Sequence, residues 1–354
     1  MALKPSEPGR SAITPLGWEP AGTHVLVPGR LPAMRRDPAP PGVVRHLEAL
    51  AAGLFGSQAL PSDPASDRVA ERATWQAWLA GTPLRLAAGT CWRAIIDLHT
   101  YRCAWPTVMF SAGAGATVHL RWAEGLYLDA KGPVKGHRDV IANKHFRGAG
   151  DTFHLNGGRR RPFTPHWWRA GRYVEIQVRI AGEDLVLESF ALEETGYPLT
   201  VDSTFSSSDP RLEQAAGPML HTLRMCMHET YVDCPYYEQL MYVGDTRLEV
   251  LATYAVSRDD RLPRAALELF DRSRRHGEGV LTCSRFPSGD AQSIPPFSLW
   301  WTAMVYDSAM WRDDPALVRR LLPGARGARC IRGAPRRRWR AALATRLELY
   351  RLDA

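Results

Sequence analysis

The period of the apolar residues changes within the stretch Thr204-Phe-Ser-Ser-Ser-Asp-Pro-Arg-Leu-Glu-Gln-Ala-Ala-Gly-Pro-Met-Leu-His-Thr-Leu-Arg-Met-Cys-Met227. Asp209 is a good N-cap residue and Pro210 follows it, so a helix is predicted to begin here. Beyond this point the apolar residues recur every three to four positions, at Leu212, Ala216, Met219, Leu223 and Met227. Such spacing is typical of one apolar helix face, and a helical region is therefore expected from about residue 205.

The residues before this stretch have the pattern of strands. Val118, Leu120 and Trp122 alternate with polar neighbours, as in a half-buried antiparallel strand. Short segments rich in β-branched and aromatic residues are found at Trp92–Leu98, Thr107–Phe110, Thr117–Trp122, Arg172–Ile180 and Leu185–Leu192. Several short strands at this spacing predict an antiparallel, jelly-roll-like β-sandwich.

Strands first and helices afterwards predict two domains rather than a βαβ fold. After the first helix, further helices are expected at Asp245–Val256, Pro263–His276, Pro296–Trp311 and Pro315–Leu322. The N-terminal region is rich in Pro, Gly and Ala, with one short helix expected around Val43–Leu54. The expected division is a partly irregular lead-in at 1–74, a β-sandwich at 75–204, a helical domain at 205–323 and a basic tail at 324–354.

Composition excludes several classes of protein. No apolar run is long enough to span a membrane, and the first residues contain no signal peptide, which favours the cytoplasm. The six cysteines have no C-x-x-C spacing, so a zinc site is not indicated and free thiols are expected.

The net charge of +8 comes almost entirely from the C-terminal tail. Residues 324–354 hold nine arginines against Glu348 and Asp353, and without them the 45 basic and 37 acidic residues fall to 36 and 35. A basic tail can bind nucleic acid, but the rest of the chain has an ordinary charge balance.

The segment Tyr231-Val-Asp-Cys-Pro-Tyr-Tyr-Glu-Gln-Leu-Met-Tyr-Val-Gly-Asp245 collects three carboxylates among four tyrosines. Glycoside hydrolysis uses carboxyl groups on both sides of a sugar ring, one of which keeps its proton near neutral pH. An aromatic surround raises the pKa of a carboxyl and offers faces for a sugar. The alternative is that Asp245 caps the next helix while Asp233 and Glu238 are solvated loop charges.

This segment resembles the Asp-Cys-Pro…Glu…Gly-Asp signature of glycoside hydrolase family 78, the inverting α-L-rhamnosidases, at Asp233, Glu238 and Asp245. The resemblance implies that Glu238 is the general acid and that Asp233 and Asp245 bind rhamnose hydroxyls. It also implies a β-sandwich followed by an (α/α)6 six-hairpin barrel that acts on terminal α-L-rhamnosides. The chain departs from the pattern at Tyr236-Tyr237 and at Leu240-Met-Tyr242, which puts the substrate preference in doubt.

Other segments extend the similarity from about residue 85 to 323. Ile294-Pro-Pro-Phe-Ser-Leu-Trp-Trp301 resembles the barrel helix that lines the sugar pocket, which makes Trp300 and Trp301 candidate substrate-binding residues. The implied partner is a rhamnose-containing carbohydrate, and neither a metal nor another cofactor is required. His166-Trp167-Trp168 is either a sugar platform or part of the sandwich core or a domain interface, of which the second reading is the commoner.

The C-terminal tail does not continue the resemblance. Five helices are expected where a six-hairpin barrel has twelve, and the family's general base lies beyond position 354. The ending Arg346–Ala354 has a possible coding sequence whose neighbouring frame reads Gly-Trp-Asn-Phe-Ile-Asp-Trp-Thr, similar to a motif of these barrels. We therefore expect a frameshift shortly after Pro323-Gly324, an accidental basic tail, no nucleic-acid binding and an inactive, truncated enzyme.

Two other classes of function stay open from the sequence. One is a carbohydrate-binding β-sandwich without catalysis, and the other is a different six-hairpin glycosidase, such as a glucoamylase-like or uronic-acid-specific enzyme. The sequence indicates neither the aglycone nor the oligomeric state.

Overall fold

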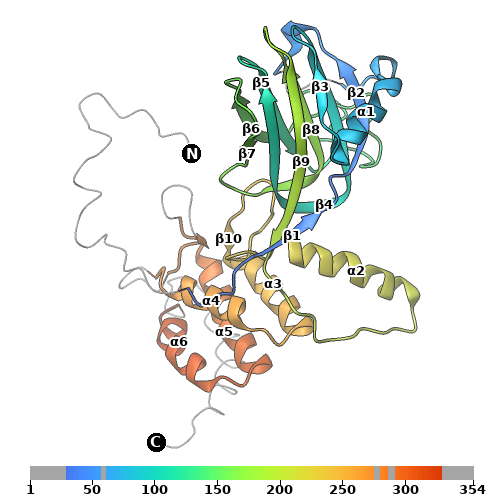
Figure 1. Cartoon of the computed structure of the whole chain (residues 1–354). Helices are drawn as coiled ribbons and strands as arrows, with labels where there is room; N and C mark the ends of the chain where they lie inside the picture. The colour runs from blue at the N-terminus through green and yellow to red at the C-terminus, as the bar shows by residue number, and fades with distance from the viewer. Residues whose placement is uncertain (1–28, 57–60, 275–279, 286–291, 329–354) are drawn as a thin grey trace, which may run out of the picture.

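The computed structural model describes residues 29–56, 61–274, 280–285 and 292–328. A β-sandwich and a helical part lie one above the other, and the long strands β4 and β9 reach from the sandwich toward the helices (Figure 1). The order of strands before helices is as the sequence predicts.

The sandwich is built from antiparallel strands that are all linked by hydrogen bonds. Its strands are β1 (Arg35–Ala39), β2 (Val43–Ala49), β3 (Leu84–Leu86), β4 (Cys91–Ala112), β5 (Thr117–Ala123), β6 (Ala149–His154), β7 (Arg161–Phe163), β8 (Arg169–Arg179) and β9 (Leu185–Gly196). The central order is β1-β9-β4-β8-β5-β6, with β2 and β7 on β4 and β3 on β9.

Strand β4 belongs to both layers of the sandwich. Its first half pairs with β2 and β8, and its second half pairs with β9 and β7. The register shifts between Asp97 and Arg102, where His99 has a φ of 66°. One 22-residue strand therefore replaces the two separate strands expected at Trp92–Leu98 and Thr107–Phe110.

The apolar core fills the space between the two layers. Alternate residues of β4, β5 and β8 point into it, among them Ile96, Val118 and Ile176. Helix α1 (Val69–Leu79) adds Trp75 and Trp78 to the same core. Two short 3-10 helices, η3 (Ala52–Leu54) and η4 (Pro64–Ser66), lie in the connection between β2 and α1.

The helix expected at Val43–Leu54 is wrong, because Val43–Ala49 is strand β2, paired with β4. His46 and Glu48 are both buried, and Glu48 forms an ion pair with Arg93 at 2.7 Å. Because β2 buries charged residues, its sequence does not show the alternation of apolar and polar residues by which a strand is usually predicted. The sheet consequently begins at Arg35, well before residue 75.

The helical part contains the helices α2 (Pro210–Met225), α3 (Val243–Val256), α4 (Arg261–Asp271), α5 (Pro295–Trp311) and α6 (Pro315–Ala328), with a short ribbon of β10 (Met241–Tyr242) and β11 (Ser284–Arg285). Asp209 caps α2 through its side chain, as predicted. Helix α4 ends at Asp271, earlier than expected, and α6 continues past Leu322 to Ala328. Residues 329–354 of the basic tail lie outside the described residues.

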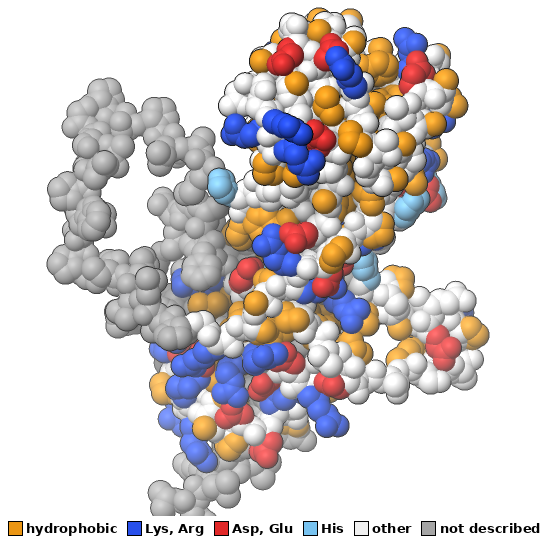
Figure 2. Space-filling view, in the orientation of Figure 1, with side chains coloured by type: hydrophobic (Ala, Val, Ile, Leu, Met, Phe, Trp, Pro, Cys, Tyr) orange, Lys and Arg blue, Asp and Glu red, His pale blue; other side chains and the backbone are white. Residues whose placement is uncertain are grey.

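Helices α3, α4, α5 and α6 share one apolar core, which includes Val250, Leu267, Trp301 and Leu321. Helix α2 joins this core near its C-terminal end, at Leu223, whereas its earlier turns project away, with Leu212 53% exposed and Met219 70% exposed (Figures 1 and 2). No helix within the described ranges is long and apolar enough to cross a membrane.

Candidate active site

The loop from Asp233 to Leu240 folds back on itself between α2 and α3. The amide of Asp233 donates to the carbonyl of Leu240 at 2.9 Å, and the amide of Leu240 donates to the Asp233 carboxylate at 3.0 Å. The amide of Glu238 donates to the Cys234 thiol at 3.3 Å. These bonds hold Asp233 half-buried at the base of the loop and leave Glu238 exposed on it.

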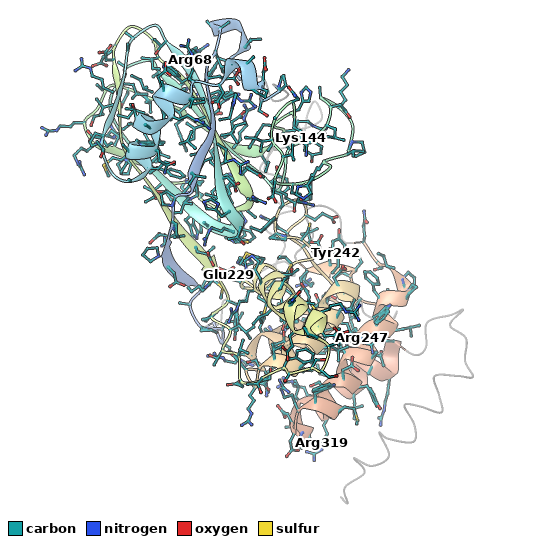
Figure 3. The ribbon with its side chains drawn as sticks, turned by 90° about the vertical axis from the view of Figure 1, so that its right-hand side faces the viewer. Arg68, Lys144, Glu229, Tyr242, Arg247 and Arg319 are labelled. Atoms are coloured by element: carbon teal, nitrogen blue, oxygen red, sulfur yellow. The ribbon has the colours of Figure 1, made fainter. Side chains whose placement is uncertain are left out.

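Tyr242 connects the end of the loop to Glu238. The Glu238 carboxylate near its phenol is the main reason why the pKa of Tyr242 is raised to about 12, and burial adds to the shift. The charge of Asp233 raises it further. Tyr242 lies at the end of the helical part that faces the sandwich (Figure 3). Glu238 and Asp233 therefore act on the same phenol.

Asp245 lies in the first turn of α3, with its side chain exposed. Gly244 before it lets α5 approach closely, since a Cβ atom at this position would lie 2.9 Å from the ring of Phe297. Gly244 is therefore needed for the packing of α3 against α5. The residue after it, Asp245, lies at the N-terminal end of α3. Such an end favours a negative charge.

Glu249 is a carboxyl of this region that the sequence did not single out. It follows Asp245 by one helical turn on α3, and burial raises its pKa to about 9, with further contributions from Asp245 and Asp233. The charges of Glu249, Asp233 and Asp245 also raise the pKa of Cys226, after burial, to about 12. The charges of the two predicted aspartates therefore reach both Glu249 and Cys226. Only the four-residue spacing to Asp245 could have indicated Glu249.

The sandwich contacts the loop on both sides of Glu238. Tyr236 donates to the carbonyl of Trp122 at 2.8 Å and accepts from the amide of Ala149 at 3.0 Å. Tyr237 contacts the Tyr127 hydroxyl at 3.0 Å and accepts from Lys135 at 2.9 Å. Gln239 accepts from the indole of Trp167 at 2.7 Å. The loop is thus held in place by residues of the sandwich between positions 122 and 167, far from it in sequence.

The two tryptophans predicted to line the pocket differ. Trp301 is fully buried and donates its indole N–H to the carbonyl of Leu267 at 3.1 Å. A side chain with no exposed surface cannot contact a sugar, so Trp301 is a core residue. Trp300 is 38% exposed, and the Arg247 guanidinium lies 4.5 Å from its ring centroid. In the described part of the chain, Trp300 makes no hydrogen bond or ring contact with the acidic loop, so it is not a member of the site.

Among the residues that the structure describes, no group of three or more His, Cys, Asp and Glu side chains has the geometry of a metal site. The described cysteines are Cys91, Cys103, Cys226, Cys234 and Cys283, and all are free thiols.

Residues 201–314 match the family model of the bacterial alpha-L-rhamnosidase 6 hairpin glycosidase domain. This segment belongs to that family. The rhamnosidase-family segment contains Asp233, Glu238 and Asp245, together with Tyr242 and Glu249. No curated protein matches the sequence.

Solved rhamnosidase structures share the fold of the chain. A rhamnosidase from Klebsiella oxytoca with rhamnose bound matches over 84% of this chain, with 21% identity and a TM-score of 0.62. A family 78 rhamnosidase from Bacillus sp. GL1 matches over 70%, with 22% identity and a TM-score of 0.57. An α-L-rhamnosidase from Streptomyces avermitilis complexed with L-rhamnose matches over 67%, with 18% identity and a TM-score of 0.51.

The chain spans only part of these rhamnosidases. It covers 56% of the Klebsiella oxytoca structure, 25% of the Bacillus structure and 22% of the Streptomyces avermitilis structure. The chain shares with them a β-sandwich followed by helices of the six-hairpin type, which is the fold class that the sequence predicts.

Proposed function

We propose that the acidic loop binds the terminal sugar of an α-L-rhamnoside. Asp233 and Asp245 would accept hydrogen bonds from its hydroxyls, and Glu238 would serve as the general acid. The observation that carries this is that all three acids lie within the segment matched by the rhamnosidase family model, with Asp233 held by hydrogen bonds at the base of the loop that carries Glu238. Two of the similar structures hold rhamnose, which supports the choice of sugar.

In the reaction, Glu238 would give its proton to the glycosidic oxygen as that oxygen leaves the anomeric carbon. Inversion needs a water on the opposite face of the ring and a second carboxyl to take its proton, about 6.5–9.5 Å from the acid. Asp233 and Asp245 are assigned to sugar hydroxyls, so a base is not assigned within this chain. Since a general acid or base contributes roughly 10²–10⁴-fold, we expect the chain of 354 residues to bind rhamnosides but to turn them over negligibly.

Calorimetric titration with methyl α-L-rhamnoside tests the binding. The unmodified chain should bind, whereas Asp233→Asn and Asp245→Asn should each weaken binding about tenfold or more, because a neutral amide replaces a charged acceptor. Glu268→Gln on α4 is the matched control, since Glu268 forms ion pairs with Arg320 and Arg30 away from the loop. Binding that survives both aspartate changes would contradict the assignment.

Turnover of an aryl α-L-rhamnoside tests the second part of the proposal. Release of the aryl group should stay close to the uncatalysed rate. Clear turnover that Glu238→Gln abolishes would keep Glu238 as the acid and would show that another residue of this chain is the base. Binding of sugar by residues 29–204 alone, unaffected by the aspartate changes, would instead favour a carbohydrate-binding sandwich.

A further inference from the structure

Trp167 is an exposed tryptophan beside the candidate acid. It lies between β7 and β8, and it keeps 48% of its surface exposed although its neighbour Trp168 is buried. Large aromatic side chains left exposed and held in place often mark binding sites. Trp167 therefore needs an explanation beyond the packing of the sandwich.

The ring of Trp167 is fixed in two ways. Its indole N–H donates to Gln239 Oε1 at 2.7 Å, and its ring stacks on Trp168 with centroids 5.7 Å apart. Trp168 in turn stacks on His228, with ring centroids 4.0 Å apart. The row of rings therefore continues from the sandwich to the residues that follow α2. Among the described residues, Trp168 is the only aromatic ring stacked on Trp167.

Gln239 joins this ring directly to the acid loop. It follows Glu238 and has a φ of 54°, a left-handed conformation that is uncommon for a residue with a side chain. Its amide nitrogen donates to the carbonyl of Pro235 at 2.8 Å while its amide oxygen holds Trp167. Such strained residues persist only where their surroundings hold them, and they cluster at binding sites.

We propose that the exposed face of Trp167 is a stacking subsite for the leaving group, either a pyranose ring or an aromatic aglycone. This rests on the proposed function, because the leaving group is the part of the substrate next to the acid that protonates it. The aromatic ring of Trp167 is bound to the residue after Glu238, so a group leaving from the Glu238 side lies within reach of it. A flat aromatic ring binds a pyranose or an aromatic aglycone by stacking against its face, and no charge is needed.

Tyr237, on the other side of Glu238, supports the same placement. It is 58% exposed, and Lys135 and Tyr127 hold its hydroxyl. The Lys135 ammonium also lies 5.3 Å from the Tyr237 ring and is paired with Glu124 at 2.7 Å. Because this cation is paired with Glu124, the exposed surface that the residues on either side of Glu238 offer to a leaving group is aromatic rather than cationic.

The test compares the affinities of the full chain for p-nitrophenyl and methyl α-L-rhamnoside by calorimetry. The aryl compound should bind roughly three- to tenfold more tightly, as a stacked aromatic contact predicts. Trp167→Ala should remove this preference and leave the affinity for the methyl compound within twofold. Trp167→Phe, which keeps a ring, and Gln239→Ala, which keeps the tryptophan, should both retain most of it.

The variants separate stacking from a structural role. An unchanged preference in Trp167→Ala would overturn the subsite, and so would a loss in Trp167→Phe as complete as in Trp167→Ala, because the hydrogen bond to Gln239 would then be the cause. Thermal unfolding of each variant checks that it is folded. Failure of the unmodified chain to bind methyl α-L-rhamnoside would instead overturn the proposed function, and the subsite with it.

Discussion

Glu249 lies one turn after Asp245 on α3, and among the described side chains its Oε2 has no hydrogen-bond partner. Burial first, and then the charges of Asp245 and Asp233, raise its pKa to about 9. The carboxyl is therefore protonated in the folded chain at neutral pH. Its unfolded form has a pKa near the ordinary 4.5 and is ionised there.

This difference makes stability depend on pH. The folded state holds the proton more tightly, so the contribution of Glu249 is complete below about pH 4.5 and is lost as pH rises toward about 9. The glutamine side chain in Glu249→Gln is neutral in both the folded and the unfolded state, so this variant does not lose stability as pH rises. We expect it to exceed the unmodified chain in free energy of unfolding by on the order of 4 kcal/mol at pH 8, and by less than about 1 kcal/mol at pH 5.

Urea unfolding at both pH values measures this difference. Glu238→Gln is the control, because its carboxyl is exposed and should give no comparable trend. A constant difference between Glu249→Gln and the unmodified chain across this range would mean that Glu249 is ionised in the folded state.

The same residues show what sequence can and cannot predict about the site. Asp233, Glu238 and Asp245 could be proposed from the sequence because their spacing is a property of the chain itself. Glu249 and Tyr242 gain their roles from burial and from contacts made only after folding. Trp301 was misassigned for the same reason, since nothing in Trp300-Trp301 indicates which ring enters the helical core.

At the scale of elements, the loop 233–240 depends on the sandwich for its shape. Tyr236 makes two hydrogen bonds to the backbone of β5 and β6, through Trp122 and Ala149. Tyr236→Phe leaves a carbonyl and an amide without this partner. The carbonyl belongs to the buried Trp122, whereas Ala149 is exposed and its amide can bond to water instead. Because a buried group that loses its partner costs about 1–3 kcal/mol, we expect a free energy of unfolding lower by about 1 kcal/mol.

Tyr237→Phe is the matched control for this change. Tyr237 also bonds through its hydroxyl, but it is 58% exposed, so water can replace the lost contacts. Its cost should be below about 0.5 kcal/mol. Equal costs for the two variants, measured by urea unfolding, would show that Tyr236 does not hold the loop to the sandwich.

The elements themselves were predicted well where period and caps agree. The start of α2 at Asp209-Pro210 and the span of α5 follow from local signals. Strand β2 was missed because its buried Glu48 is satisfied by Arg93, a residue 45 positions away. An ion pair between residues so far apart forms only in the tertiary structure, so it cannot be predicted from a short segment of sequence.

At the scale of the whole molecule, the described helical part is unevenly packed. Helices α3 to α6 share a core, whereas α2 and the end of α3 border an apolar groove of about 490 Å³ that includes Phe205, Leu212, Met219 and Ala252. Figure 2 shows hydrophobic side chains on the projecting α2 segment. Phe205 is 60% exposed and Met219 is 70% exposed, more than is usual for such residues.

Local stability should follow this packing. Amides in segments with few buried apolar contacts open without global unfolding, whereas central strands exchange only when the domain unfolds. We therefore expect residues 211–220 of α2 to exchange their amide hydrogens faster, by at least about tenfold, than residues 92–97 of β4 and 173–178 of β8. Hydrogen exchange followed by mass spectrometry on the expressed chain measures both.

Two substitutions on α2 sharpen the same argument, because they lie on one helix and differ in burial. Met219→Glu places a charge on a side chain that is 70% exposed, and it should change the free energy of unfolding by less than about 0.5 kcal/mol. Leu223→Glu places the charge on a side chain that is 8% exposed and in the helical core, and it should cost several kcal/mol, roughly as much as an unpaired buried charge. Strong protection across α2, together with a large loss for Met219→Glu, would mean that the exposed face is covered in solution, and α2 would then be as firmly held as the sandwich.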